Sequence, residues 1–241
     1  MRSLVEPPAP TRDRGQTGTK GVEQVLEVGC GTGYWLAGLR LVARTCFGLD
    51  LSAGMLAQAR ARGEQLILTR GRACELPFAD ACADLIYCVN AIHHFQRPRD
   101  FVREARRVLR PGGAMVVAVT DPRAHRNRWY IYDYFMGTYE TDLDRFPFWG
   151  TIVDWMIEEG LERIEWRLVE RIEDHKTGRD VFADPFLQKN ACSQLALLSD
   201  EAYAAGLRRI ATALTESEAK GETITFPTDL WQAMLIGWVG G

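Results

Sequence analysis

Short apolar segments alternate with helical patterns along the first half of the chain. Each apolar segment is bounded by turn residues, which is typical of a buried parallel strand. The expected strands are 25–28, 45–49, 65–69, 84–89 and 114–119. Apolar residues recur at helical spacing between them, which predicts helices at 34–42, 53–62 and 99–109. Strands that alternate with helices predict right-handed βαβ units and a parallel sheet.

The second half of the chain has a weaker pattern. Its aromatic spacing predicts a helix at 129–139, and further elements are expected as a helix at 149–160 and strands at 162–172 and 229–239. Helix starts are predicted at Asp184-Pro185 and at Ser199. We interpret residues 173–222 as a helical insertion that either caps the active site or builds a contact in a homodimer.

A glycine-rich turn follows the first predicted strand, in the sequence VLEVGCGTG at 25–33. Gly29, Gly31 and Gly33 let the backbone turn sharply and approach a ligand closely. The next strand ends in Asp50, the usual place for a carboxylate that accepts hydrogen bonds from a ribose diol. Strand, glycine turn, helix, strand and acid predict half of a nucleotide-binding α/β sheet.

The residues around the turn favour S-adenosylmethionine over a dinucleotide as the ligand. A dinucleotide fingerprint needs a third glycine at the position of Tyr34. Glu27 would also repel a pyrophosphate. S-adenosylmethionine carries a sulfonium and an ammonium group, so an acid at position 27 suits it. The same two residues argue against a dehydrogenase.

Five segments resemble the class I S-adenosylmethionine-dependent methyltransferases, in particular the ubiquinone/menaquinone-biosynthesis-like (methyltransferase type 11) group. They occur in the family's order: VLEVGCGTG at 25–33, GLDLSAGML at 48–56, ELPF at 75–78, ADLIYCVNAIHHF at 83–95 and VLRPGG at 108–113. The resemblance ends near Val119. It implies a Rossmann-like α/β fold with a seven-stranded sheet, mostly parallel with an antiparallel last strand, and helices on both faces. The helical insertion expected at 173–222 would interrupt the chain before that last strand.

The resemblance also implies a cofactor, S-adenosylmethionine, and a product, S-adenosylhomocysteine. The residues it implies around the methionine portion, the ribose and the adenine are Glu27, Gly29, Cys30, Gly31, Asp50, Leu51, Met55 and Asn90. The chain departs from the family at Arg72 and Ala73, where an acid usually reads the adenine amino group. Arg72 has only donors. It either stacks on the adenine, turns outward and leaves the Ala73 backbone to read the base, or accommodates an anionic group on an altered cofactor.

The expected reaction is methyl transfer to a small-molecule acceptor by in-line displacement. His94 is the candidate base, with a packed or capping histidine as the equally weighted alternative. Tyr130, Tyr134 and His125 are candidates for a lid that touches substrate. Two other functions stay open: an RNA or protein methyltransferase that uses the basic and aromatic segment 123–139, and a noncatalytic S-adenosylmethionine-binding subunit that works through the insertion.

Charge and composition bear on which partners the protein binds and on the cellular compartment it occupies. The net charge of −3 and pI near 5.9 argue against a nucleic-acid or membrane-surface partner. No apolar run is long enough to span a membrane and no leader pattern is evident, so we expect a cytoplasmic protein. The six cysteines form no CxxC pair, so we expect buried thiols and no metal site.

The expected organisation has three parts. Residues 1–24 form a poorly packed tail, 25–120 the cofactor-binding core, and 121–241 a part that completes the sheet and carries a lid at 121–146. Because little chain precedes Val25, the last part is expected to cover the cofactor.

Overall fold

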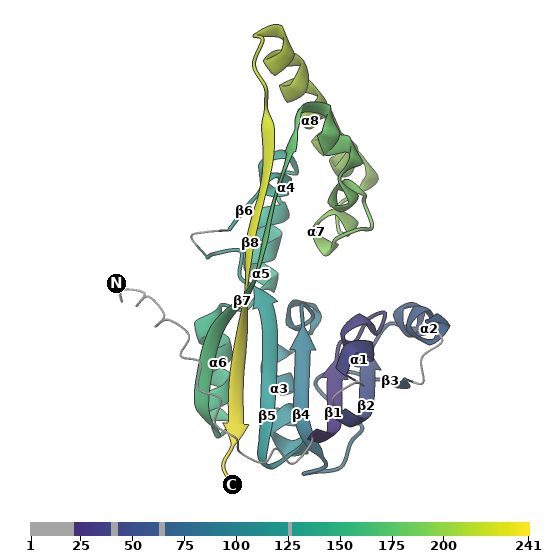
Figure 1. The fold of residues 1–241 in the computed structure, drawn as a ribbon, viewed down its shortest axis with the longest axis vertical. Coiled ribbons are helices and arrows are strands. Elements are labelled where there is room, and N and C mark those ends of the chain that lie inside the picture. The colour runs from purple at the N-terminus through teal and green to yellow at the C-terminus, as the bar shows by residue number, and fades with distance from the viewer. Residues whose placement is uncertain (1–21, 40–42, 63–65, 125–126) are drawn as a thin grey trace.

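A computed structural model describes residues 22–39, 43–62, 66–124 and 127–241 (Figure 1). The predicted tail lies outside the described residues up to position 21, as do His125 and Arg126 of the predicted lid.

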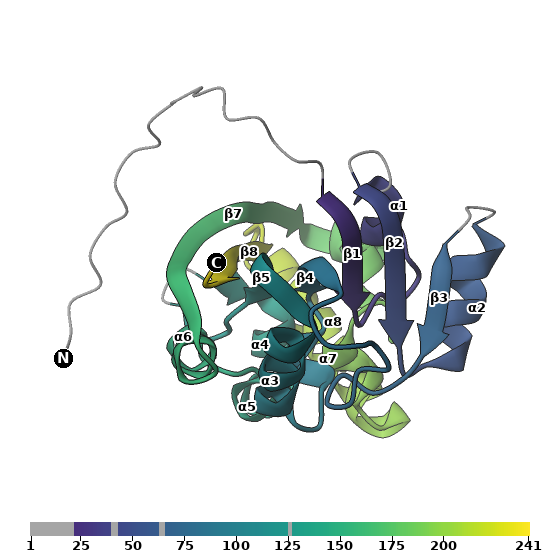
Figure 2. The ribbon, with the colours of Figure 1, turned by 90° about the horizontal axis from the view of Figure 1, so that it is seen from below.

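A single sheet runs through the molecule, in the strand order β3-β2-β1-β4-β5-β8-β6, with β7 paired to β8. The first five strands of this order are parallel, and β8 pairs antiparallel with β5, β6 and β7. Strand β3 forms one lateral edge of the sheet, and β7 lies toward the opposite edge (Figure 2). The strands are β1 Val22–Val28, β2 Ala43–Asp50, β3 Ile67–Arg70, β4 Ala83–Val89, β5 Leu109–Thr120, β6 Arg128–Trp129, β7 Leu161–Thr177 and β8 Thr225–Val239.

The predicted fold class is confirmed, with one difference in strand number. The sheet has eight strands because the two residues of β6 pair with Thr228 and Asp229 of β8, beyond the end of β5. A helix was predicted to begin at Trp129, so this pairing was not anticipated.

Helices cover both faces of the sheet. Leu36 of α1 packs with Val25 and Tyr87 on one face, whereas Phe101 and Val102 of α3 pack with Leu26 on the other. The α-helices are α1 Tyr34–Leu39, α2 Ala53–Ala61, α3 Pro98–Val108, α4 Tyr130–Tyr134, α5 Thr138–Arg145, α6 Trp149–Glu158, α7 Ser193–Ala196 and α8 Asp200–Ala219. Short 3-10 helices are η1 Ile92–His94, η2 Gly178–Ala183 and η3 Pro185–Leu187.

Several helix starts follow their predicted caps. The hydroxyl of Ser52 accepts from the Met55 N–H, and that of Ser199 accepts from the Ala202 N–H. Asp184 accepts from the Phe186 N–H at the start of η3. Each of these bonds satisfies a backbone donor that a helix start leaves unpaired.

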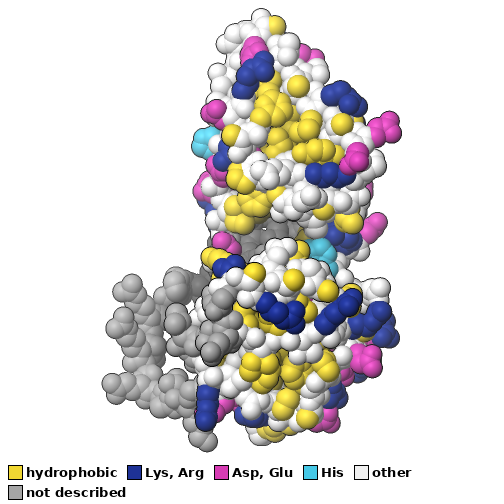
Figure 3. All heavy atoms as spheres, turned by 90° about the vertical axis from the view of Figure 1, so that its right-hand side faces the viewer, with side chains coloured by type: hydrophobic (Ala, Val, Ile, Leu, Met, Phe, Trp, Pro, Cys, Tyr) yellow, Lys and Arg dark blue, Asp and Glu magenta, His cyan; other side chains and the backbone are white. Residues whose placement is uncertain are grey.

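Strands β7 and β8 continue past the end of β5 and carry a second hydrophobic core at their far end (Figure 1). We call this part, built on η2, η3, α4, α5, α7, α8 and the outer ends of β7 and β8, the cap. Its largest fully buried side chains are Tyr130, Phe135 and Phe226. A narrow waist separates the cap from the sheet and its helices (Figure 3).

The structure corrects several predictions in this half, among them the start of the last strand, since β8 begins at Thr225 and not at position 229. Strand β7 runs to Thr177, five residues past the predicted end, because the polar segment 173–177 pairs with β8 without an apolar pattern to announce it. The helices of the insertion span 178–219. The single helix predicted at 129–139 is wrong, since Gly137 at φ +82° separates α4 from α5.

Among the helices in the described part of the chain, none combines the length and apolar character needed to cross a bilayer.

Substitution of two helical glycines by alanine should change stability in opposite directions. Gly206 lies in the cap, and Gly38 lies in α1, outside it. A Cβ added at Gly206 of α8 would meet the buried Phe135 ring at 2.2 Å, whereas one added at Gly38 of α1 would meet nothing within 4 Å. We expect Gly206→Ala to lower the free energy of unfolding by about 1–3 kcal/mol through overpacking. Gly38→Ala should raise it by up to ~1 kcal/mol through helix propensity. Urea denaturation of both variants measures this, and a stabilised Gly206→Ala would contradict the packing described.

Candidate active site

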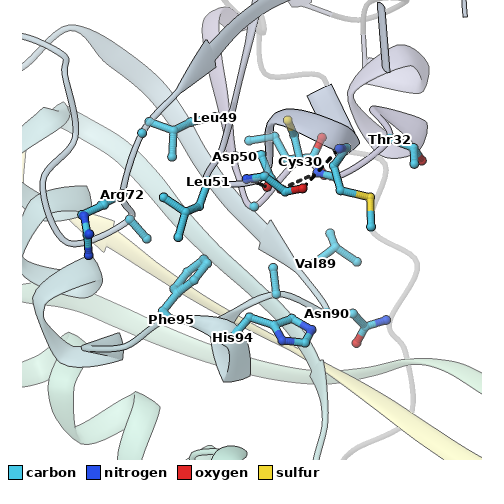
Figure 4. A pocket seen from close by; sticks show the side chains of 18 of the residues that line it. Cys30, Thr32, Leu49, Asp50, Leu51, Arg72, Val89, Asn90, His94 and Phe95 are labelled. Carbon is cyan, nitrogen blue, oxygen red and sulfur yellow. Dashed lines mark hydrogen bonds between the residues drawn. The ribbon is translucent and has the colours of Figure 1, made fainter. Parts of the chain in front are cut away.

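A pocket of about 740 Å³ opens at the carboxyl ends of β1, β2 and β4 (Figure 4). The structure brings every predicted cofactor residue, and His94, to its wall. These lining residues are Glu27, Gly29, Cys30, Gly31, Asp50, Leu51, Met55, Arg72, Ala73, Asn90 and His94.

The glycine turn is fixed by bonds to the end of the neighbouring strand. The N–H groups of Gly29 and Cys30 donate to the Leu49 carbonyl at 2.7 and 3.0 Å. Gly29 has φ +77°, and a Cβ there would lie 2.4 Å from the Cβ of Ala91. The turn therefore requires glycine at position 29, both for its conformation and for space.

Asp50 holds the turn with both carboxylate oxygens. Its Oδ2 accepts from the Gly31 N–H at 2.8 Å, and its Oδ1 accepts from the Ser52 N–H at 2.8 Å (Figure 4). A carboxylate has about four acceptor sites, so each oxygen retains one for a ligand. The arrangement can therefore accept two hydroxyl groups while it keeps the turn in place.

Glu27 is a buried acid beneath the turn, with only 2% of its surface exposed. Burial raises the pKa of its carboxyl to about 8, against the opposing effect of the Tyr87 hydroxyl, which donates to Oε2 at 2.9 Å. The nearby charge of Asp50 raises the pKa further. A cation bound beside Glu27 would favour the carboxylate, so the pair of acids suits a positively charged ligand.

The far end of the pocket is apolar with a basic rim. Leu51 and Met55 are 52% and 43% exposed, and Leu51 and Phe95 point toward the same part of the cavity (Figure 4). Arg72 donates from Nη1 to Gln96 Oε1 at 3.0 Å, so one donor of its guanidinium is already engaged. Exposed apolar side chains of this kind can pack on a flat, uncharged ring.

Sequence reasoning missed several residues of this wall, among them Thr32, Tyr34, Trp35, Phe95 and Gln96. Phe95 closes the motif ADLIYCVNAIHHF, so its position in the motif could have identified it. Tyr34 and Trp35 lie directly after the turn, and from sequence Tyr34 serves only as the residue that breaks the dinucleotide fingerprint and begins a helix.

A second pocket, of about 340 Å³, adjoins the first, and Asn90 and His94 line both. Asn90 follows β4 in the left-handed conformation at φ +46°, where its N–H donates to the Ala118 carbonyl at 2.8 Å. Asparagine tolerates this conformation better than most residues. Backbone strain of this kind clusters at functional sites. The two pockets therefore meet at a side chain held in an uncommon geometry.

The second pocket lies between the sheet and the cap. The insertion contributes Phe186 and residues 191–194, and β7 and β8 contribute Ile172, Thr228 and Leu230. The segment between β5 and α6 contributes Pro122, Trp129, Tyr132 and Phe146. Part of the insertion thus faces the edge of the sheet where the first pocket opens.

The histidine pair sits at the junction of the pockets. His93 is buried and stacks on Phe146 with ring centroids 3.8 Å apart, and burial places its pKa far below the usual range. His94 remains open to both pockets. Desolvation and then the charge of Arg145 lower the pKa of His94, which keeps the imidazole neutral and able to accept a proton at neutral pH.

The structure does not bring Tyr130 or Tyr134 to either pocket. Tyr130 is fully buried and donates its hydroxyl to Asp184 Oδ2 at 2.9 Å, and both rings pack on Phe226 in the cap core. Tyr132 lines the second pocket instead. In the sequence YIYDYF at 130–135 nearly every side chain is apolar or aromatic, so the pattern could not tell which face of the helix turns inward.

Within the described residues, no group of three or more His, Cys, Asp or Glu is placed to hold a metal ion. The six cysteines all lie in the described part of the chain, and none of them is joined in a disulfide there.

Comparison with known proteins identifies the part of the chain that builds the first pocket. Residues 26–117 match the family model of the methyltransferase domain. The chain is 40% identical over 94 residues to a Mycolicibacterium smegmatis protein named "Probable S-adenosylmethionine-dependent methyltransferase", covering 39% of this chain and 37% of that protein. It is 41% identical over 105 residues to demethylmenaquinone methyltransferase of Tropheryma whipplei, covering 42% and 43%. The similarity thus spans less than half of these relatives, and it confirms the resemblance carried by the five motifs.

Solved structures extend the likeness over nearly the whole chain, at the level of fold. A protein from an antibiotic biosynthesis pathway of Anabaena variabilis has a TM-score of 0.68 at 21% identity, covering 90% of this chain and 91% of that one. The cyclase SpnF has a TM-score of 0.53 at 21% identity, covering 91% and 76%. Since a cyclase shares the fold, the fold alone does not specify the reaction.

The raised pKa of Glu27 predicts how stability depends on pH. Folded Glu27 keeps its proton up to about pH 8, whereas the unfolded residue loses it near pH 4.5, so the folded state binds more protons between these values. The free energy of unfolding should therefore fall as pH rises through this window. We expect Glu27→Gln, which cannot titrate, to remove that part of the slope in urea denaturation.

Tyr87→Phe provides the matched comparison. It removes the hydroxyl that favours the Glu27 carboxylate, so the fall in stability should extend to higher pH. Equal slopes in wild type and Glu27→Gln would contradict a buried, protonated acid at position 27.

Proposed function

We propose that this chain, whose residues 26–117 form a class I S-adenosylmethionine-dependent methyltransferase domain, transfers a methyl group from S-adenosylmethionine to a small-molecule acceptor. The observation that carries this proposal is the pair of adjoining pockets that share Asn90 and His94. A donor in the larger pocket and an acceptor in the smaller one would meet at these two residues. Such a junction can hold the reacting groups in line and exclude water, which is the main task in this reaction.

The residues of the first pocket fit S-adenosylmethionine. Glu27 would hold the cationic methionine end, and the free acceptor sites of Asp50 would take the ribose hydroxyls. Leu51, Met55 and Phe95 would flank the adenine, with Arg72 or the backbone at Ala73 on its edge. Bound there, the cofactor supplies a methyl group on a positively charged sulfur, which is already activated for transfer.

We assign to His94 the role of accepting the proton that the acceptor loses. Its imidazole is neutral at neutral pH and faces both pockets, so it can take the proton of a hydroxyl acceptor. Asn90 would orient the methionine portion at the same junction. The other wall residues would keep the site dry.

Two observations favour a small molecule over RNA or protein. The acceptor pocket is small, at about 340 Å³, and is walled by the cap. Arg123 of the basic segment donates to the carbonyls of Phe146 and Leu143 and pairs with Asp121, so its guanidinium holds the chain between β5 and α6. Arg126 lies outside the described residues, which leaves Arg128 as the exposed, described cation of the three that an RNA could contact.

The proposal is tested by titration calorimetry with S-adenosylhomocysteine and with NAD. We expect saturable binding of the first and none of the second. Asp50→Ala should raise the dissociation constant of S-adenosylhomocysteine by about 100-fold or more, because the variant loses two charge-assisted hydrogen bonds of roughly 1.5–3 kcal/mol each. It should also lower stability, since two backbone N–H groups lose their acceptor.

Asp84→Ala is the control for that loss of stability. Asp84 accepts from the backbone N–H groups of Glu23 and Gln24 at 3.0 and 2.8 Å and does not line the pocket. It should lower stability and leave binding unchanged. Binding of NAD without binding of S-adenosylhomocysteine would overturn the proposal. If Asp50→Ala left the dissociation constant of S-adenosylhomocysteine unchanged, the ribose would have to lie elsewhere.

The role of His94 predicts a change in rate and in pH profile. With a hydroxyl acceptor, His94→Gln should lower kcat by about 100-fold or more, as expected for a lost general base. It should also remove the acidic limb of the pH profile, which lies below the ordinary histidine pKa because the pKa of His94 is lowered. His175→Gln, on the exposed part of β7, should change neither. A His94→Gln variant with the wild-type pH profile would assign the proton to another group.

A further inference from the structure

Four planar groups stack from the cap toward the junction of the two pockets. The Arg145 guanidinium lies over the Phe146 ring, with its central carbon 5.7 Å from the ring centroid. The Phe146 ring stacks on His93 at 3.8 Å, and the centroid of the His93 ring lies 4.1 Å from that of His94. From this stack we infer that Arg145 and its partner Asp142 are positioning residues for His94. Neither of the two lines a pocket, so they would act through His94 and not on a ligand.

Asp142 fixes the guanidinium at the outer end of the stack. Its carboxylate is fully buried, and Oδ1 accepts from Nη2 of Arg145 at 2.6 Å. Oδ2 accepts from the Tyr132 hydroxyl at 2.8 Å and from Gln194 Nε2 at 2.6 Å. Tyr132 and Gln194 line the second pocket. The ion pair is therefore attached both to the stack that ends at His94 and to the wall of the proposed acceptor pocket.

The two charges of the pair act on His94 in opposite directions. Desolvation lowers the pKa of His94 most, Arg145 lowers it further, and Asp50 and Asp142 raise it. The two rings between the ion pair and the imidazole are buried, so water screens these charges weakly. A base that is too weak cannot take the acceptor's proton, and one that is too strong is already protonated at neutral pH. The balance within the pair thus sets how readily His94 accepts a proton.

The other titratable groups around this imidazole are neutral at neutral pH. Burial holds the pKa of His93 far below the usual range, and it raises the pKa values of Cys192 and Tyr132 in the facing wall. Glu27 keeps its proton up to about pH 8. Among the described groups that act on the imidazole, the fixed charges are thus the carboxylate of Asp50, at the end of β2, and the ion pair in the cap.

Proton NMR titration measures the protonation of His94 without cofactor or acceptor, so this test does not depend on the proposed function, on which the use of His94 in methyl transfer rests. The chain has four histidines, and His94→Gln identifies the signal. We expect Arg145→Met to raise the pKa of His94, because it removes the cation and leaves the Asp142 carboxylate uncompensated. Asp142→Asn should lower it, because the guanidinium loses its counter-ion. Loosened packing alone would move the pKa in the same direction in both variants, toward the ordinary value.

The conservative variant and a second ion pair serve as controls. Arg145→Lys keeps a cation beside Asp142, so the pKa of His94 should stay below its value in Arg145→Met. Arg110→Met and Asp84→Asn break another pair, in which Nη1 of Arg110 lies 2.9 Å from Oδ1 of Asp84. Neither residue of that pair lines either pocket, so both variants should leave the titration of His94 unchanged.

Each outcome decides for or against the inference. Shifts in the same direction, or no shift in either variant, would overturn it. If Asp142→Asn does not fold, equal pKa values of His94 in Arg145→Met and Arg145→Lys would overturn it. If the Arg145 variants do not fold, an unchanged or raised pKa in Asp142→Asn would do so.

The two proposals can fail separately. Failure of S-adenosylhomocysteine to bind overturns the proposed function, while opposite shifts of the His94 pKa still support the control of His94 by the ion pair. If both variants titrate as the wild type does, the inference fails, and the proposed function stands if S-adenosylhomocysteine binds.

Discussion

The bonds that Asp50 accepts from Gly31 and Ser52 tie three elements together at one point. They fix the turn after β1, the end of β2 and the start of α2, so the geometry of the larger pocket depends on one carboxylate. That charge lies near Glu27, whose pKa it helps to raise. The arginines of the pocket wall, Arg72 and Arg97, come instead from the segments after β3 and η1. A cation bound beside these two acids would pair with the Asp50 carboxylate and favour the ionised form of Glu27, and this supports the choice of a sulfonium donor.

The first pocket could be predicted from sequence because its residues belong to local motifs. In a parallel sheet, the carboxyl ends of neighbouring strands meet at one edge, so residues that follow β1, β2 and β4 must converge. Glu27 lies one residue before the end of β1, Asp50 ends β2, and Asn90 directly follows β4. The spacing of strand, turn and helix therefore placed side chains in space without knowledge of any distant contact.

The second pocket could not be predicted in this way. Its wall is assembled from segments as far apart as Asn90, Trp129, Ile172 and Gln194, and no local pattern links them. Around α4 the sequence is apolar on all sides, so the inward face is chosen by packing against Phe226 and Phe135 and not by periodicity. The polar end of β7 is likewise a strand only because β8 runs beside it.

This division has a consequence for substrate assignment. The methyltransferase domain match ends at residue 117, and of the residues that line the second pocket only Asn90, His93 and His94 lie within it. The similarity to the relatives covers less than half of each of them, so it does not carry an acceptor over to this chain. The donor side of the reaction can be argued from shared motifs, whereas the acceptor has to be argued from the cap itself. The residues that line the second pocket are for that reason stronger ground for the acceptor's chemistry than the name of any relative.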